Sequence, residues 1–119
     1  MSPRPVRRAL VVIRDGPAGE RGWLALRTAL SLGLGGYAVS VWLTGGAVVL
    51  ALAGADVGAW SGGDPGADLD GLIGDMGAGA YVDSDALDNA GGQVRHGVVA
   101  AGRAELERLY REAQLVVVP

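Results

Sequence analysis

The 119-residue chain contains no cysteine, no lysine and no phenylalanine, and its one histidine is His96. Without cysteine it can form no disulfide, bind no metal through thiolate and carry no persulfide or acyl thioester of its own. Without lysine it has neither a Schiff-base nucleophile nor the phosphate-binding lysine of a Walker motif. A single histidine excludes a multi-histidine metal site within one copy of the chain. We therefore expect no catalytic residues, no bound metal and no cofactor.

The chain also has a small negative net charge and few large side chains. The formal net charge is −3, which argues against nucleic acid as a ligand because such binders neutralise phosphates with an excess of basic residues. Apolar residues make up 50% of the chain and glycine contributes 21 residues, so the expected core is built from small side chains. The length is typical of one domain, and we expect a single domain over residues 1–119.

The longest uncharged run extends from Thr28 to Ala55 and raises the question of a membrane. Glycine pairs at 35–36 and 45–46 divide it into pieces shorter than the about 20 residues that a membrane helix needs. We therefore interpret the run as protein interior, with a helix, a strand and a second helix. Ala9–Ile13 is too short for a signal-peptide core and is followed by Arg14, so the default expectation is a cytoplasmic protein.

Apolar strands alternate with amphipathic helices along the chain. The helix that starts at Glu20 is expected to bury a stripe formed by Trp23, Leu26, Leu30 and Leu34. Strands are expected over 9–13, 37–43, 80–82 and 115–118, with further helices over 69–77, over 102–114, and after a capping Ser84; residues 94–101 fit either a strand or a loop. This order predicts a three-layer α/β sandwich around a mainly parallel sheet of four or five strands.

Open parallel sheets place their binding sites beyond the carboxyl ends of the strands. Three loops are expected there, over 14–22, 44–47 and 83–92. The first is rich in glycine and carries Arg14 and Arg21, which fit an anion site, although a glycine- and proline-rich loop is more often only a turn. The third begins with Asp83, Ser84 and Asp85, where Asp83 fits either a helix cap or a ligand-binding residue.

The stretch between Arg27 and Arg95 contains eight aspartates, Asp56 and Asp64 among them, and no basic residue. A calcium loop around Asp68–Gly71 lacks the first and last carboxylate ligands, so solvated loop and cap residues are the better interpretation. The sequence YVDSD also resembles the start of aspartate-dependent phosphatases, but those enzymes need a lysine that this chain lacks.

The segments DGPAGERGWLALRTAL and GYAVSVWLTGGAVVLAL, together with YVDSDALDNAGG at 81–92, resemble the DsrE/DsrF/TusC group of small sulfur-relay proteins. The resemblance covers nearly the whole chain and implies a flavodoxin-like domain that assembles into trimers or hexamers. In members that carry sulfur, a cysteine follows the strand before the short helix, and that position resembles Asp83 here. An aspartate cannot hold a persulfide.

The resemblance therefore implies a non-catalytic partner subunit in a sulfur relay, which associates with itself and with other relay subunits while another protein supplies the thiol. The alternative is a module that binds a small molecule, nucleotide or anion near Asp83, with Ser84, Asp85, Arg14 and Arg21 as neighbours.

Overall fold

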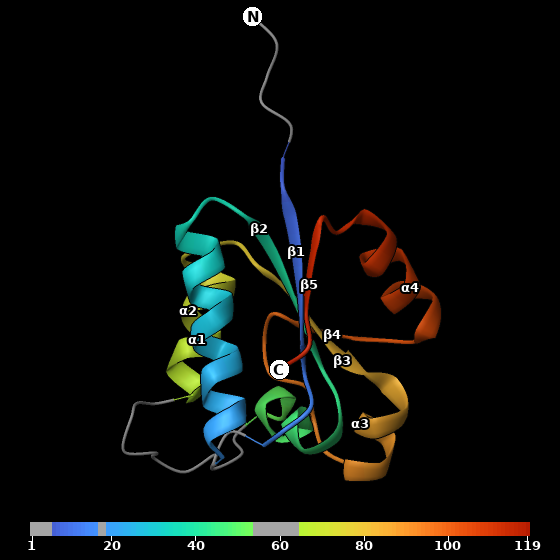
Figure 1. Ribbon diagram of the computed structural model, residues 1–119. Coiled ribbons are helices and arrows are strands. Elements are labelled where there is room, and N and C mark those ends of the chain that lie inside the picture. Colours follow the sequence, from blue (N-terminus) through green and yellow to red (C-terminus); the bar gives the residue numbers. More distant parts are fainter. Residues whose placement is uncertain (1–5, 17–18, 54–64) are drawn as a thin grey trace, which may run out of the picture.

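The computed structural model describes residues 6–16, 19–53 and 65–119 and contains five parallel strands in the order β4-β3-β2-β1-β5 (Figure 1). The elements are β1 (Arg8–Ile13), α1 (Glu20–Leu34), β2 (Ala38–Leu43), the 3-10 helix η1 (Gly45–Ala51), α2 (Pro65–Gly74), β3 (Gly79–Asp83), α3 (Ser84–Ala90), β4 (Val98–Ala101), α4 (Arg103–Glu112) and β5 (Leu115–Val117). The predicted three-layer α/β sandwich is thus confirmed. Residues 94–101, which fitted either a strand or a loop, contain the strand β4.

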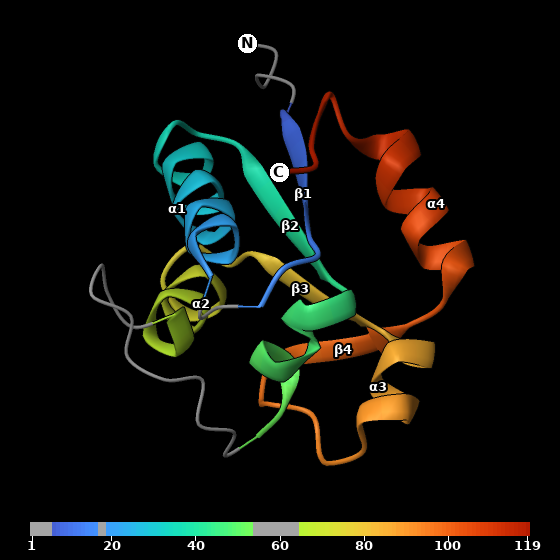
Figure 2. The same cartoon turned by 60° about the horizontal axis from the view of Figure 1, so that its bottom comes forward.

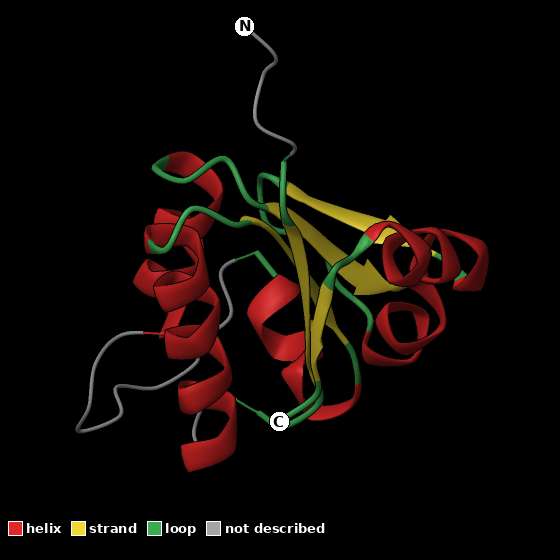
Figure 3. Cartoon of the chain, turned by 45° about the horizontal axis from the view of Figure 1, so that its top comes forward, coloured by secondary structure: helices red, strands yellow, loops and turns green. Residues whose placement is uncertain are grey.

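The chain adds β2, β3 and β4 on one side of β1 and then returns to place β5 on the other side. Because parallel crossovers are right-handed, this reversal sends the last helix to the opposite face of the sheet from α1 and α2. Figure 3 shows helices on both sides of the sheet. The strand β1 lies between these layers and is buried from Ala9 to Ile13, as its unbroken apolar sequence predicts.

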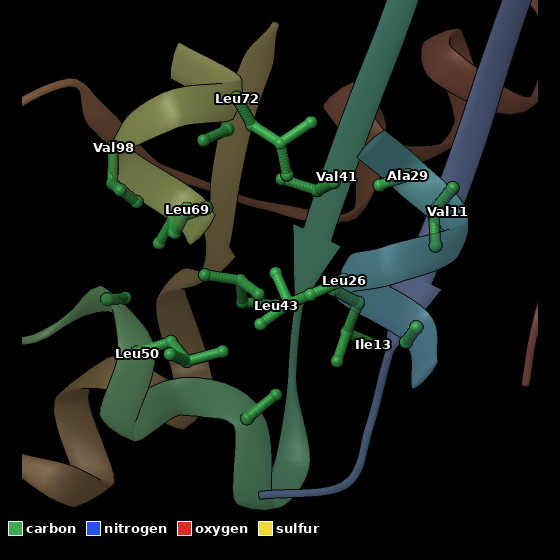
Figure 4. Packing of buried hydrophobic residues seen from close by; sticks show 14 of the residues in the cluster. Val11, Ile13, Leu26, Ala29, Val41, Leu43, Leu50, Leu69, Leu72 and Val98 are labelled. Carbon is green, nitrogen blue, oxygen red and sulfur yellow. The ribbon is translucent and has the colours of Figure 1, made fainter. Parts of the chain in front are cut away.

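Alternation along the strands divides the core into two unequal clusters. The larger includes Val11, Val41 and Val82 and packs against α1, α2 and η1 (Figure 4). The smaller contains Leu10, Val12 and Trp42 and packs against Leu109 of α4. The second face is therefore covered mainly by one amphipathic helix.

The helix α1 corrects the predicted apolar stripe. Leu26 is fully buried, but Leu34 at the last turn is 80% exposed and Trp23 is only partly buried. The tightest contacts with the sheet are instead made by small residues, and the buried positions are Gly22, Ala25, Leu26 and Ala29. Small side chains allow this helix to approach the sheet closely, which the spacing of the large residues does not reveal.

The uncharged run from Thr28 forms the end of α1, the strand β2 and the helix η1, while its last residues, Gly54 and Ala55, lie outside the described part of the chain. The expected second helix is a 3-10 helix, with Ala47, Val48, Leu50 and Ala51 buried. No helix in the described part of the chain is long and apolar enough to cross a membrane.

Three helices differ from the prediction in where they begin, in which residue caps them or in which side chain they bury. The helix α2 begins at Pro65, earlier than the expected residue 69, and proline is well suited to a first helical turn. The helix α3 is capped by Asp83, whose side chain accepts a hydrogen bond from the backbone N–H of Asp85, so the prediction that Ser84 is the cap was wrong. In α4, Tyr110 is 43% exposed although it follows Leu106 by four residues, the spacing of an apolar helix face.

Candidate functional site

The carboxyl edge of the sheet brings together Thr44 after β2, Asp83 at the end of β3 and the loop that follows β1. Figure 2 shows η1 and α3 beside the ends of these strands. The two neighbouring strands β2 and β3 run in parallel, so the residues that follow them lie next to each other. This edge is the candidate site that the sequence predicted.

Both carboxylate oxygens of Asp83 are hydrogen bonded within the chain. Oδ2 accepts a bond from the Thr44 hydroxyl at 3.2 Å, and Oδ1 accepts one from the backbone N–H of Asp85 at 3.1 Å. The side chain therefore caps α3 and also ties the end of β3 to the end of β2. This geometry gives Asp83 a structural role that accounts for its position without a ligand.

The other predicted site residues are dispersed along this edge. Asp85 is exposed in the first turn of α3, and Ser84 is half-buried beside Asp83. The guanidinium of Arg14 donates a hydrogen bond to the carbonyl oxygen of Pro119 at 3.3 Å, on the β5 side of β1, whereas Asp83 lies two strands away in the other direction. Arg14 therefore turns away from Asp83. A ligand-binding role stays a prediction for all four residues, Arg14, Asp83, Ser84 and Asp85.

Arg21 is exposed in the first turn of α1, where it borders a shallow hollow of about 490 Å³. The hollow is also lined by Asp15, Gly16, Gly19 and Glu20. Two carboxylates share this hollow with one guanidinium, so its lining does not favour an anion by charge. In the described part of the chain no three His, Cys, Asp or Glu residues are grouped to hold a metal ion.

The loops at this edge pack backbone against backbone. Gly45 has φ +56°, a conformation that favours glycine, and a Cβ there would come within 2.9 Å of the Arg14 carbonyl oxygen. The N–H of Gly46 donates to that same carbonyl oxygen at 2.9 Å. The loop after β2 thus lies directly on the loop after β1, which leaves little space for a ligand between them.

Sequence reasoning missed Thr44 as a partner of Asp83. A usable signal was present, because Thr44 and Asp83 each stand at the end of an expected strand and a hydroxyl is a natural donor to a carboxylate. What the sequence did not specify is that β2 and β3 are neighbours in the sheet.

Replacing Asp83 with alanine removes both the cap and the bond to Thr44. We expect Asp83→Ala to lower the free energy of unfolding by about 1–2 kcal/mol, the usual range for loss of an N-cap. Asp88→Ala, at an exposed position of the same helix, is the matched control and is expected to change it by less than about 0.5 kcal/mol. Urea denaturation followed by circular dichroism measures both values, and equal effects would contradict the capping role.

The sheet order, the helices on both faces and the loops at the carboxyl edge define a flavodoxin-like three-layer α/β protein. The YchN protein of E. coli has a crystal structure similar to this one, with a TM-score of 0.83 and 18% sequence identity over 96% of this chain and 100% of that chain. No protein-family model matches the sequence, and no curated protein matches it. The likeness to YchN establishes a shared fold.

Proposed function

We propose that the protein is a non-catalytic, DsrE/DsrF-like subunit that acts by assembly in a cytoplasmic sulfur-relay system. The fold shared with YchN over 96% of this chain supports this reading, and it agrees with the fold that the family resemblance implies. The observation that carries the proposal is a helix-capping aspartate at the position that resembles the family's sulfur-carrying cysteine. The chain has no cysteine, and the position that resembles the family's carrier cysteine holds Asp83, whose two oxygens are already hydrogen bonded.

Assembly with other copies is supported by the second face of the sheet. Beside α4, this face carries Tyr81 of β3 and Val99 of β4, and Val99 is 56% exposed. A hollow of about 540 Å³ lies here, lined by Tyr81, Val99, Ala101, Gly102, Ala104 and Glu105 among others. The edge strand β4 has no charged residue to discourage pairing with another chain. We name this area, defined by Tyr81, Val99 and Ala101, the β3–β4 surface.

Size-exclusion chromatography with light scattering tests self-association. We expect the full chain to have a mass three or six times the 12.0 kDa of one copy. Val99→Lys places a charge on the β3–β4 surface and is expected to shift the protein to single copies, because burying an unpaired ammonium is costly. Leu34→Lys, at the exposed end of α1, is the matched control and should leave the mass unchanged.

A wild-type mass of 12.0 kDa at all concentrations would overturn the self-association. Equal behaviour of Val99→Lys and Leu34→Lys would overturn the choice of surface instead.

The sulfur-relay role needs a separate experiment. A DsrE-type carrier protein loaded with labelled persulfide should co-elute with this chain, while no label becomes attached to it, because it has no thiol to accept sulfur. Absence of co-elution together with an unchanged rate of sulfur delivery by the carrier would contradict the role. A thermal shift with nucleotide or divalent metal that disappears in Asp83→Asn would favour the alternative, a ligand-binding module centred on Asp83.

A further inference from the structure

A second cavity lies at the amino edge of the sheet, opposite to the loops described above. Its volume is about 280 Å³, and it lies between α4 and the first residues of β1, β2 and β3. The residues that matter for its chemistry are Arg8, Ser40, Gly79, Tyr81, Arg108 and Glu112. The volume is close to the lower end of the range for small-molecule pockets, so it suits a ligand of few atoms.

Two hydroxyl groups converge in this cavity. A Cβ built on Gly79 would lie 3.3 Å from the Ser40 Oγ and 3.4 Å from the Tyr81 hydroxyl oxygen, so both approach one point above the glycine. Within the part of the chain that the structure describes, neither hydroxyl has a hydrogen-bond partner. The Tyr81 ring is held in place by stacking on Trp42, with ring centroids 6.3 Å apart. Both hydroxyls can therefore donate a hydrogen bond to a ligand that enters the cavity.

The charged groups that line the cavity carry a positive excess. Arg8 and Arg108 stand against one carboxylate, Glu112, which accepts a bond from Arg108 Nη1 at 2.6 Å and lies 3.9 Å from the Arg8 Nη1. Arg108 is also held by Glu105, which lines the neighbouring hollow instead. The hydrogen bond from Arg108 holds the pKa of Glu105 below its usual value, so this pair remains ionised near neutral pH.

The Arg108 guanidinium has five N–H groups, and these two carboxylates do not use all of them. An acceptor that enters the cavity would therefore meet a positioned cation as well as the two hydroxyls.

We propose that this cavity binds a small anion, either a carboxylate or a tetrahedral oxyanion such as phosphate. The anion would accept hydrogen bonds from Ser40 and Tyr81 and lie beside the guanidinium of Arg108. Because Gly79 has no side chain, the space next to the two hydroxyls stays available to the anion. The site uses none of the residues assigned to the carboxyl edge or to assembly except Tyr81, whose ring belongs to the β3–β4 surface and whose hydroxyl belongs to the cavity.

Titration of the isotope-labelled full chain followed by amide NMR tests the site, with sodium phosphate and sodium acetate as separate ligands at constant ionic strength in sodium chloride. We expect saturable shifts at Ser40, Gly79 and Tyr81 with at least one of the two anions. Tyr81→Phe keeps the ring and removes the hydroxyl, and it is expected to weaken binding about tenfold, because the hydrogen bond lost is to a charged group. Tyr110→Phe, at the exposed face of α4, is the matched control and should bind as the wild type does.

The two ligands separate the two classes of anion, since saturation by acetate alone identifies a carboxylate site and saturation by phosphate alone an oxyanion site. Gly79→Ala provides a second test that does not depend on a hydroxyl, because the added methyl group enters the same point and should abolish binding. Absence of saturable shifts with both anions, or equal affinity in Tyr81→Phe and Tyr110→Phe, would overturn the proposal. Loss of the phosphate response in Asp83→Asn but not in Tyr81→Phe would also overturn it and place the anion at the carboxyl edge.

Discussion

Leu43→Ala is expected to lower the free energy of unfolding by about 2–5 kcal/mol, the range for truncating a buried leucine. The Leu43 side chain is 0% exposed and lies at the centre of the larger core cluster, between α1 and η1 (Figure 4). The truncation removes apolar contacts and leaves a cavity that helices on one side and the sheet on the other cannot easily close. Since a domain of this size is stabilised by only about 5–15 kcal/mol, the loss is a large fraction of the total.

The matched control for this substitution is Leu34→Ala, which deletes the same atoms from a side chain that is 80% exposed. We expect a change within about 0.5 kcal/mol, because little apolar surface returns to water. Chemical denaturation followed by tryptophan fluorescence measures both values. If the two substitutions cost the same, the interior described for the uncharged run would be wrong.

Gly22→Ala is expected to destabilise the protein by about 1–3 kcal/mol, although alanine is the better helix former. A Cβ at this buried position of α1 would lie 2.3 Å from the carbonyl oxygen of Gly16 and 2.9 Å from that of Asp15. Both contacts are with backbone atoms, so relief requires movement of the loop between β1 and α1. That loop also packs on Gly46, and the substitution should therefore disturb the whole carboxyl edge.

Gly71→Ala is the matched control, since Gly71 lies inside α2 and, among the described residues, its added Cβ would meet only the Asp75 Oδ2 at 3.8 Å. There the ordinary preference of helices for alanine applies, and we expect a gain of up to about 1 kcal/mol. The two substitutions are chemically identical and are expected to have opposite signs. Thermal unfolding checks the signs, and stabilisation by both would show that the loop does not lie against α1 as described.

The strands were well specified by the sequence because buried parallel strands have a simple pattern. Ala9–Ile13 is unbroken and apolar, and it forms β1 with one further residue at its start. The helices were located for a similar reason, by glycines and by apolar spacing. Their buried faces were less predictable, since Leu34 and Tyr110 fit the apolar spacing and are nevertheless exposed. Spacing defines a face of a helix, but it does not say how far the sheet extends beneath it.

The candidate site was only partly predictable. The sequence places Asp83 at the end of a strand and allows it to cap the next helix, and the structure shows that cap. The partner Thr44 depends on which strands are neighbours, and the turn of Arg14 towards Pro119 depends on the last strand lying beside the first. The convergence of Ser40, Gly79 and Tyr81 beneath α4 is likewise a product of strand register.

By itself the sequence determined which chemistry the protein lacks, because folding cannot supply the thiol of a missing cysteine or the ammonium group of a missing lysine. It also determined the alternation of strands and helices. The tertiary structure decided which side chains meet. Contacts between residues far apart in the chain, such as the one between Thr44 and Asp83, exist only once the strand order is β4-β3-β2-β1-β5. The physical reason is that local propensity acts over a few residues, whereas the strand order follows from burying both faces of the sheet at once.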